Sequence, residues 1–410
     1  MALLHRLFGS AWLPHLVLLG LALAWIASGG PFPAPWAEWL TDYAEYAIAA
    51  VGSTVAVLAL LYRQANVAFQ AAIAVLGFFA LGHATAAELA VALVAVLAPL
   101  NYFALTLLDE RGLLSRAGLL RLAAVGGQAA LVVATLEYAP AFSRAITDTT
   151  LLPEVLRGGY NLPDQAMVIA CATATVMLGL AIAQPLPSRV GALSALLALL
   201  IGLELTLASN RGLLLPALFT LLALALLLLA ILQEAHRLAF RDGLTGLPNR
   251  RAMDTLLASL GGRYTIAMMD VDRFKAFNDT HGHDVGDQVL RRVARSVGRV
   301  GQRGRPFRYG GEEFSVVFPG QEVEAVVPAL EAVREEIAAT PFRIRSRQRP
   351  ADDRRGSRRR GQGAEQAVPI TISIGVAGTG EEATSPEEVV QAADQALYRA
   401  KRAGRNRLAQ

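Results

Sequence analysis

Residues 264–272 read Tyr-Thr-Ile-Ala-Met-Met-Asp-Val-Asp, and residues 308–314 read Arg-Tyr-Gly-Gly-Glu-Glu-Phe. The first stretch is a short apolar run that ends in carboxylates, which predicts a buried strand over 264–269 with acidic side chains at its end. The second stretch places a glycine pair between two short apolar segments and predicts a hairpin turn. If these strands are neighbours in one sheet, Asp270 and Glu312 face one another across the sheet edge.

The segments around these two stretches complete an α/β domain that is long enough to enclose a core. Apolar spacing predicts further strands over 307–309, 314–318 and 370–376, and helices over 285–300, 323–338 and 386–402. The order strand, helix, strand, strand, helix, strand is that of the ferredoxin-like split unit. In that unit the first strand lies beside the hairpin.

The carboxylates of this domain favour a metal site. Clustered acidic side chains that face solvent repel one another, and the usual reason to keep them together is a hard cation. Mg²⁺ accepts one or two protein carboxylates and takes its other ligands from water and phosphate. Gly310 and Gly311 are expected to give the turn positive φ and to leave room for a ligand. The hairpin motif alone leaves open an ordinary turn with solvated glutamates.

Lys275 and Lys401 are the only lysines in a chain with 38 basic residues. A compact ammonium acts as a point charge on phosphate, and a planar guanidinium does not replace it freely. Lys275 follows the 270–272 carboxylates closely, and Lys401 with Arg405 closes the last predicted helix. We expect these cations to contact the phosphates of a metal-bound nucleotide.

Asn278 and Asp287 form a candidate pair for reading a base. A carboxylate, which only accepts, suits the adjacent N1 and N2 donors of guanine, and an amide both donates and accepts. The pair therefore favours guanine over adenine. His283 and Asp284 lie between them in sequence, and each is either a second contact or a helix cap, because Asp284 directly precedes the predicted helix.

Several segments of this half resemble the GGDEF diguanylate cyclases, with the hairpin motif in its GGEEF form. They are residues 242–251, 270–275, 278–279, 282–287, 308–314 and 401–406. The resemblance assigns 243–410 to a GGDEF domain and does not extend to the first 230 residues. It implies a ferredoxin-like, nucleotide-cyclase-type α/β fold. It also implies condensation of two GTP molecules into cyclic di-GMP and two pyrophosphates, with each domain of a homodimer presenting one GTP.

By similarity, the site residues divide into metal ligands, guanine contacts and phosphate contacts. The metal ligands are Asp270, the Val271 carbonyl, Glu312 and Glu313. The guanine contacts are Asn278, His283 and Asp287, and the phosphate contacts are Lys275, Lys401 and Arg405. Glu312 is also the candidate base for the 3′-hydroxyl that attacks the partner's α-phosphate, and Lys275 offsets charge on the leaving pyrophosphate. Two Mg²⁺ ions, or Mn²⁺ in their place, would polarise the phosphate and lower the pKa of that hydroxyl.

One departure from the family concerns product inhibition. Many members carry an inhibitory product site, Arg-x-x-Asp, shortly before the hairpin. The corresponding residues here are Gly301-Gln302-Arg303-Gly304. We therefore expect no inhibitory product site and no feedback inhibition through it.

A second departure is the stretch 343–360, which holds nine arginines against two aspartates. Pro350, Gly356 and Ser357 indicate a loop inserted before the 370–376 strand. A solvated loop, contact with anionic lipid headgroups and contact with nucleic acid are the alternatives. No aromatic side chains are interleaved with the arginines, so we expect no nucleic-acid partner.

The composition of the whole chain indicates a membrane protein, because 54% of residues are hydrophobic and only 18% are charged. The single cysteine, Cys171, excludes a disulfide scaffold. Eight apolar runs approach the length that crosses a bilayer. They are residues 11–28, 43–62, 65–82, 86–108, 119–139, 165–183, 190–208 and 213–232. We predict an α-helical polytopic membrane domain over 1–232 with about eight transmembrane helices, the first retained rather than cleaved as a signal peptide.

Arginine counts predict the orientation of this domain, since cytoplasmic loops carry the basic excess. With both ends in the cytoplasm, eight arginines of the connections lie inside and three lie outside. The prediction is a multi-pass protein of the bacterial inner membrane with the N-terminus and the GGDEF domain in the cytoplasm. Asn101, Gln128 and Glu204 are polar groups at membrane depth, and either helix packing or a ligand or proton site explains them.

Residues 233–242 are predicted to be a helical linker. An apolar stripe over 231–238 suits a short parallel helix pair in a dimer, and a simple amphipathic exit helix explains it equally well. The membrane region would then act as a sensor or anchor that sets the geometry of two cyclase domains. A catalytically silent receptor for GTP or cyclic di-GMP is the alternative function.

Overall fold

The computed structural model describes residues 10–27, 34–83, 87–138, 162–208, 214–344, 366–380 and 385–410. The chain forms two compact units, residues 1–237 and residues 238–410. Each unit has its own hydrophobic core, so each is described by itself.

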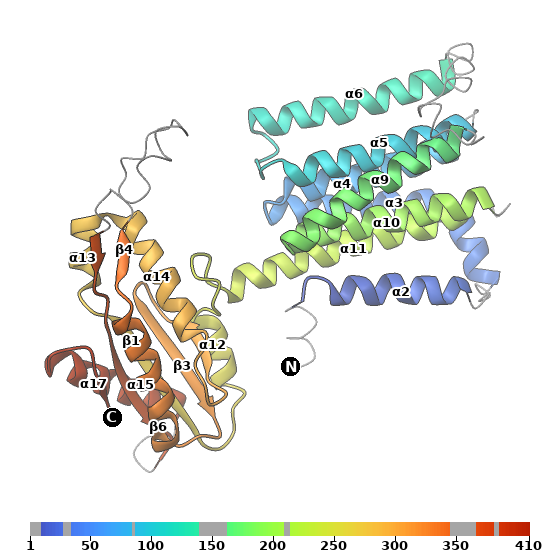
Figure 1. Cartoon of the computed structure of the whole chain (residues 1–410). Coiled ribbons are helices and arrows are strands. Elements are labelled where there is room, and N and C mark those ends of the chain that lie inside the picture. The colour runs from blue at the N-terminus through green and yellow to red at the C-terminus, as the bar shows by residue number, and fades with distance from the viewer. Residues whose placement is uncertain are drawn as a thin grey trace. The chain divides into compact units, whose positions relative to one another are not determined.

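The first unit consists of long apolar helices that lie side by side (Figure 1). Those that the structure describes are α2 (Leu13–Ala27), α3 (Ala34–Leu61), α4 (Ala65–His83), α5 (Ala87–Leu107), α6 (Arg116–Tyr138), α9 (Leu162–Ala183), α10 (Pro187–Ala208) and α11 (Leu214–Phe240). Each overlaps one of the eight predicted apolar runs. Seven are long and apolar enough to cross a membrane, whereas α2 has 15 residues and is shorter.

Two features of this unit bear on the predictions. The amide of Asn101 on α5 donates to Gln128 Oε1 on α6 at 2.9 Å, so these two polar side chains link neighbouring helices. Helix α11 runs without interruption for 27 residues and includes most of the predicted linker. Asn101 and Gln128 thus form a hydrogen bond between two helices, as their interpretation as helix-packing residues requires.

The second unit has a five-stranded sheet in the order β2-β3-β1-β6-β7. The strands are β1 (Tyr264–Val271), β2 (Arg305–Arg308), β3 (Glu313–Pro319), β6 (Ile372–Gly378) and β7 (Leu408–Ala409). Strand β1 is buried along its whole length and pairs antiparallel with both β3 and β6. The first four strands have the ferredoxin-like order, so the predicted neighbourhood of the first strand and the hairpin is confirmed.

Helices cover both faces of this sheet. They are α12 (Arg250–Leu257), α13 (Phe274–His281), α14 (His283–Val297), α15 (Val323–Ala339) and α17 (Pro386–Arg402), and β4 (Phe342–Ile344) pairs with β5 (Gln366–Val368) in a separate two-stranded sheet. The larger core includes side chains of α14 and α15, and a second core on the other face includes those of α12 and α17. The site is thus built on a sheet packed on both sides.

Several details differ from the sequence prediction. Helices α12 and α13 were not expected, because eight residues are too few for a clear apolar period. Helix α14 begins at His283 with Gly282 as its N-cap, and Asp284 lies in its first turn. Of the two alternatives for His283 and Asp284, a helix cap is therefore wrong. Residues 345–365, most of the predicted arginine-rich loop, lie outside the described residues.

Gly375 sets the distance between β6 and α17. A Cβ atom at this position would lie 2.0 Å from the Leu397 nitrogen and 2.2 Å from the Ala393 oxygen, both of which are backbone atoms of α17. Backbone atoms cannot rotate away as a side chain can, so only glycine fits. This close approach positions α17, which ends with Lys401 in its last turn.

We predict that Gly375→Ala destabilises the second unit by about 1–3 kcal/mol, the usual range for overpacking a core. Hydrogen exchange of the full chain in urea should show protection lost first across α17. Gly261→Ala is the matched control, because a Cβ at that position would meet nothing within 4 Å. Equal protection in both variants would contradict the steric argument.

Candidate active site

Three carboxylates meet at the edge of the sheet where β1 ends. Asp270 pairs in register with Glu313, and the Val271 nitrogen donates to the Glu312 carbonyl at 3.3 Å. Burial, and then the charge of Asp270, raises the pKa of both Glu312 and Glu313. Burial also raises the pKa of Asp270 itself. The structure therefore brings the predicted carboxylates together in a place where a cation would relieve their repulsion.

Lys401 lies directly on this carboxylate cluster. Its Nζ is 2.8 Å from Asp270 Oδ2, and its side chain is 32% exposed against 9% for Asp270. The Arg405 charge also acts on Asp270 and opposes the rise of its pKa. Two of the three predicted phosphate contacts thus adjoin the predicted metal ligands. Lys275 is exposed in the first turn of α13, and no ion pair of Lys275 occurs within the described ranges.

Arg308 holds the hairpin turn in place. Its guanidinium donates to the carbonyls of Gly310 and Gly311 at 3.2 and 2.6 Å and pairs with Asp242 at 2.7 Å. Burial by itself would raise the pKa of Asp242, but hydrogen bonds from Thr245 and Arg308 outweigh burial and lower this pKa. Sequence reasoning gave Asp242 and Arg308 no role, although both lie in the quoted motifs.

The expected conformation of the glycine pair is wrong. The glycines with positive φ in the described residues do not include Gly310 or Gly311. A Cβ at position 310 would lie 2.6 Å from Glu313 Oε2, so a larger residue there would displace the Glu313 carboxylate. At Gly311 a Cβ would meet nothing within 4 Å, so there is open space beside the backbone, as expected for the approach of a ligand.

The predicted base-reading residues come from two adjacent helices. Asn278 lies on α13 and Asp287 on α14, and α13 packs on α14. Gly286 lies so close to Asn278 that a Cβ there would be 1.9 Å from its Oδ1. This Oδ1 is buried, and no described residue donates a hydrogen bond to it. A buried acceptor without a donor is what a ligand's N–H group would complete. His283 is exposed at the start of α14.

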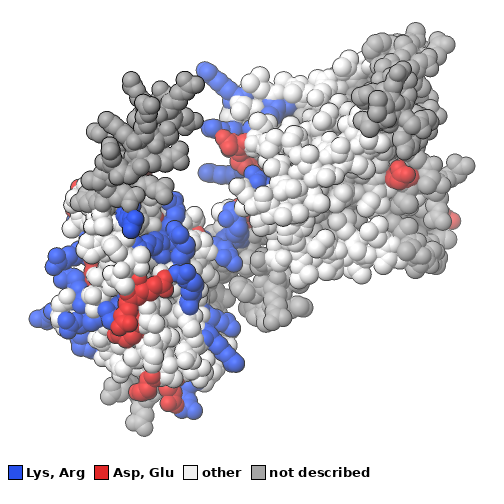
Figure 2. Space-filling model, in the orientation of Figure 1, with Lys and Arg blue, Asp and Glu red and all other residues white. Residues whose placement is uncertain are grey.

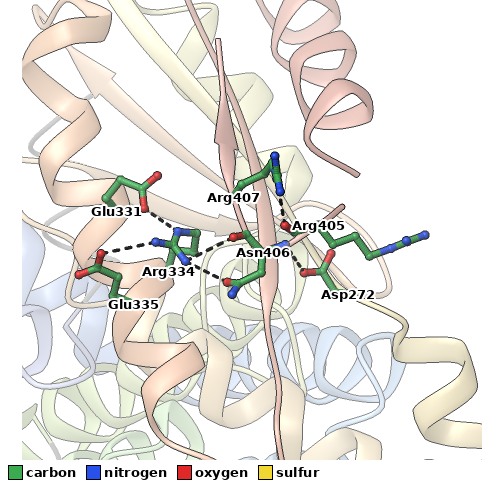
Figure 3. A network of polar contacts seen from close by, with 7 residues as sticks. All are labelled: Asp272, Glu331, Arg334, Glu335, Arg405, Asn406 and Arg407. Atoms are coloured by element: carbon green, nitrogen blue, oxygen red, sulfur yellow. Dashed lines mark hydrogen bonds and ion pairs between the residues drawn. The ribbon is translucent and has the colours of Figure 1, made fainter. Parts of the chain in front are cut away.

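Asp272 has a different environment from the other acidic residues of the predicted cluster. Its Oδ1 accepts from the Ser373 hydroxyl at 2.7 Å, and its Oδ2 accepts from the Thr371 hydroxyl at 2.7 Å. The Asn406 nitrogen also donates to Oδ2 at 3.0 Å, as Figure 3 shows. Both oxygens are therefore already used within the protein. Asp272 ties β1 to β6 and to the turn after α17.

The donor set at the sheet edge fits a cation that also binds phosphate. Among the residues that the structure describes, no group of three or more acidic, histidine or cysteine side chains is arranged to hold a metal ion by itself. Mg²⁺ does not require such a cage, since it keeps several waters and uses substrate phosphates. Asp270, Glu312 and the Val271 carbonyl could hold it, with Glu313 beside them.

The stretch that corresponds to the family's inhibitory site contains glycine at both key positions, 301 and 304. A Cβ at Gly304 would lie 2.7–2.8 Å from side-chain atoms of Phe318, Val300 and Val316. A carboxylate side chain would therefore not fit there without movement of the core. The absence of feedback inhibition stays a prediction.

The sequence of the second unit is similar to known proteins. The family model described as "Diguanylate cyclase, GGDEF domain" matches residues 239–354 and 355–407. The chain is 38% identical over 183 residues to the response regulator PleD of Caulobacter vibrioides, covering 43% of this chain and 37% of that protein. It is 39% identical over 186 residues to the diguanylate cyclase DgcP of Pseudomonas aeruginosa, covering 43% and 25%.

The crystal structure of the coiled coil and GGDEF domain of DgcB from Caulobacter crescentus, in complex with c-di-GMP, matches at 36% identity. That match covers 43% of this chain and 88% of the DgcB chain, with a TM-score of 0.37. The chain spans about a third and a quarter of the length of the two curated relatives. Residues 239–407 carry the match to the family model, so the second unit of this chain is a domain of the GGDEF diguanylate cyclase family.

Proposed function

We propose that the chain is a diguanylate cyclase that condenses two GTP molecules into cyclic di-GMP and two pyrophosphates. The observation that carries the proposal is the meeting of Asp270, Glu312 and Glu313 with Lys401 at one edge of the sheet. Carboxylates that adjoin a lysine suit a nucleotide triphosphate bound through a cation. The family match and the curated relatives support the same reaction.

The residues have separate tasks in this proposal. Asn278 and Asp287 orient guanine, and Lys275, Lys401 and Arg405 hold the phosphates and offset charge on the leaving pyrophosphate. Glu312 takes the proton of the 3′-hydroxyl that attacks the α-phosphate of the second GTP. Mg²⁺, held by Asp270, the Val271 carbonyl, Glu312 and Glu313, supplies Lewis-acid polarisation of the phosphate when it is bound. One domain binds one GTP, so the reaction needs two domains face to face in a homodimer.

Glu312→Gln is expected to reduce cyclic di-GMP formation by about 10²-fold or more, because the amide cannot accept the proton and binds a cation poorly. The measurement is product analysis by liquid chromatography of the full chain in lipid nanodiscs with GTP and Mg²⁺. Glu322→Gln is the matched control, since Glu322 forms an exposed ion pair with Arg263 at the other end of β1. No product from the wild type, even when the domains are forced to dimerise, would favour the silent receptor instead.

Asp287→Asn is expected to weaken discrimination between GTP and inosine triphosphate, which lacks the N2 amino group. The wild type should favour GTP by about tenfold or more, because a carboxylate acceptor left without its donor is costly. In the variant the two KM values should converge, mainly through a higher KM for GTP. Steady-state kinetics with each nucleotide test this, and an unchanged ratio of KM values would show that Asp287 does not read the N2 group.

We further propose that α2–α6 and α9–α11 form a multi-pass domain of the bacterial inner membrane. Arginines 63, 111, 116, 121, 189 and 237 lie at or near helix ends that alternate topology assigns to the cytoplasm. In Figure 2 the blue side chains of the helical unit gather toward one end, and its flank is white. Anionic lipid headgroups are a further proposed partner of the arginine-rich stretch 343–360.

The orientation predicts which positions a membrane-impermeant maleimide reaches. In a Cys171→Ala background, Ser209→Cys lies between α10 and α11 and should react in intact spheroplasts. Arg111→Cys lies between α5 and α6 and should react only after the membrane is opened. The reverse labelling pattern would invert the proposed topology.

A further inference from the structure

The turn that follows α17 has an unusual backbone. Gly404, Arg405 and Asn406 have φ values of 115°, 64° and 44°, so three successive residues lie in the left-handed region. For a non-glycine residue such as Arg405 this conformation costs about 1 kcal/mol and persists only where the surroundings enforce it. The cause of this conformation must therefore lie in the contacts of the turn.

Asn406 is held from two sides (Figure 3). On one side Arg334 of α15 donates through Nη1 to the Asn406 Oδ1 at 3.0 Å and to its carbonyl at 3.4 Å. On the other side the Asn406 nitrogen donates to Asp272 at 3.0 Å. Thr371 and Ser373 of the neighbouring chain segment fix Asp272 in turn. Asn406 thus has little freedom to change its backbone conformation.

Arg334 is itself fixed and is not available to a ligand. Its Nε donates to Glu331 at 2.5 Å, its Nη2 lies 3.5 Å from Glu335, and its side chain is 17% exposed. Because its Nη1 is used by Asn406, all three nitrogens of the guanidinium have partners. Arg334 therefore supports the turn and does not bind phosphate.

The consequence of this support appears at Arg405, one residue earlier. Arg407 Nε donates to the Arg405 carbonyl at 3.2 Å, and the Arg405 nitrogen donates to the Ala400 carbonyl at 3.1 Å. With its backbone held, the Arg405 side chain extends away from Arg334, as Figure 3 shows. Its charge acts on Asp270, where Lys401 also binds.

We propose that Asp272 and Arg334 are positioning residues: by locking Asn406 they hold Arg405 where its guanidinium meets the outer phosphates of bound GTP. The inference rests on the proposed function, because it takes the phosphate contact of Arg405 from there. Preorganised cations lose less freedom when the ligand binds, so removing the support lowers affinity without removing any contact to the ligand. The effect is confined to the triphosphate end of the nucleotide.

The test compares two ligands in calorimetric titrations of the full chain in nanodiscs with Mg²⁺. The α,β-methylene analogue of GTP carries the outer phosphates and cannot be condensed, whereas GMP keeps the guanine, the ribose and the α-phosphate but lacks the outer phosphates. Arg334→Met should weaken binding of the analogue by up to about tenfold, which is the loss expected if Arg405 is no longer held in place to donate to the charged phosphate. It should leave GMP affinity within about twofold, since the guanine contacts on α13 and α14 do not depend on the turn. Asp272→Asn should act in the same direction.

A double-mutant cycle separates positioning from a general loss of structure. In an Arg405→Ala background, Arg334→Met should have no further effect on the analogue, because it acts only through Arg405. Arg263→Met removes an exposed ion pair at the other end of β1 and serves as the matched control. Additive losses in the cycle, an equal loss of GMP and analogue affinity, or unchanged analogue affinity would each overturn the inference.

These outcomes are distinct from failure of the proposed function. A wild-type chain that binds the analogue but makes no cyclic di-GMP contradicts the cyclase, while the cycle still decides the role of Arg334. A wild-type chain that binds neither ligand contradicts both.

Discussion

Strand β1 is hydrogen-bonded along both edges, to β3 on one side and to β6 on the other, and every one of its residues is buried. Pairing on both sides fixes its register, since a slip of one residue would turn every side chain to the opposite face and move Asp270 out of register with Glu313. The end of the strand is therefore a rigid place for Asp270. The same pairing brings Glu313, and with it Glu312, beside Asp270, so the site depends on this register.

Two close approaches bring the remaining charges to that point. Gly375 lets α17 pack against β6 at a distance no other residue allows, and Lys401 reaches Asp270 from the last turn of α17. The turn beyond it is held by Asp272 and Arg334, and Arg405 extends from that turn. The carboxylates come from the sheet and the cations from α17 and the turn after it, so the site requires the packing of both.

The junction between α11 and the domain is also tied to the hairpin. Asn249 donates to the carbonyls of Ala239 and Phe240, in the last turn of α11, at 2.9 and 3.0 Å. Asp242, two residues after that helix, pairs with Arg308 at the base of the glycine turn. A displacement of the end of α11 would therefore act on the hairpin that carries Glu312.

Sequence alone predicted a first half of long apolar helices, an α/β second half and the order of the main strands, and the structure has all three. It also singled out Asp270, Glu313 and Lys401, which the structure brings together. These features are local patterns that can be recognised from the sequence alone. They are apolar runs of membrane length, the alternation of short strands and helices, and a motif with several spaced positions. The short helices α12 and α13 were missed because eight residues carry little periodicity.

Tertiary structure decided what each charge does. In sequence Asp270 and Asp272 are equivalent members of one acidic cluster. In the structure Asp270 lies beside Glu313 and Lys401. Asp272 instead accepts hydrogen bonds from two hydroxyl groups and a backbone amide. Arg334 lies outside every motif, and only the fold brings α15 to Asn406. Gly310 does not have a positive φ, and it lies against the Glu313 carboxylate. Such roles depend on contacts between residues far apart in the chain, which no local pattern encodes.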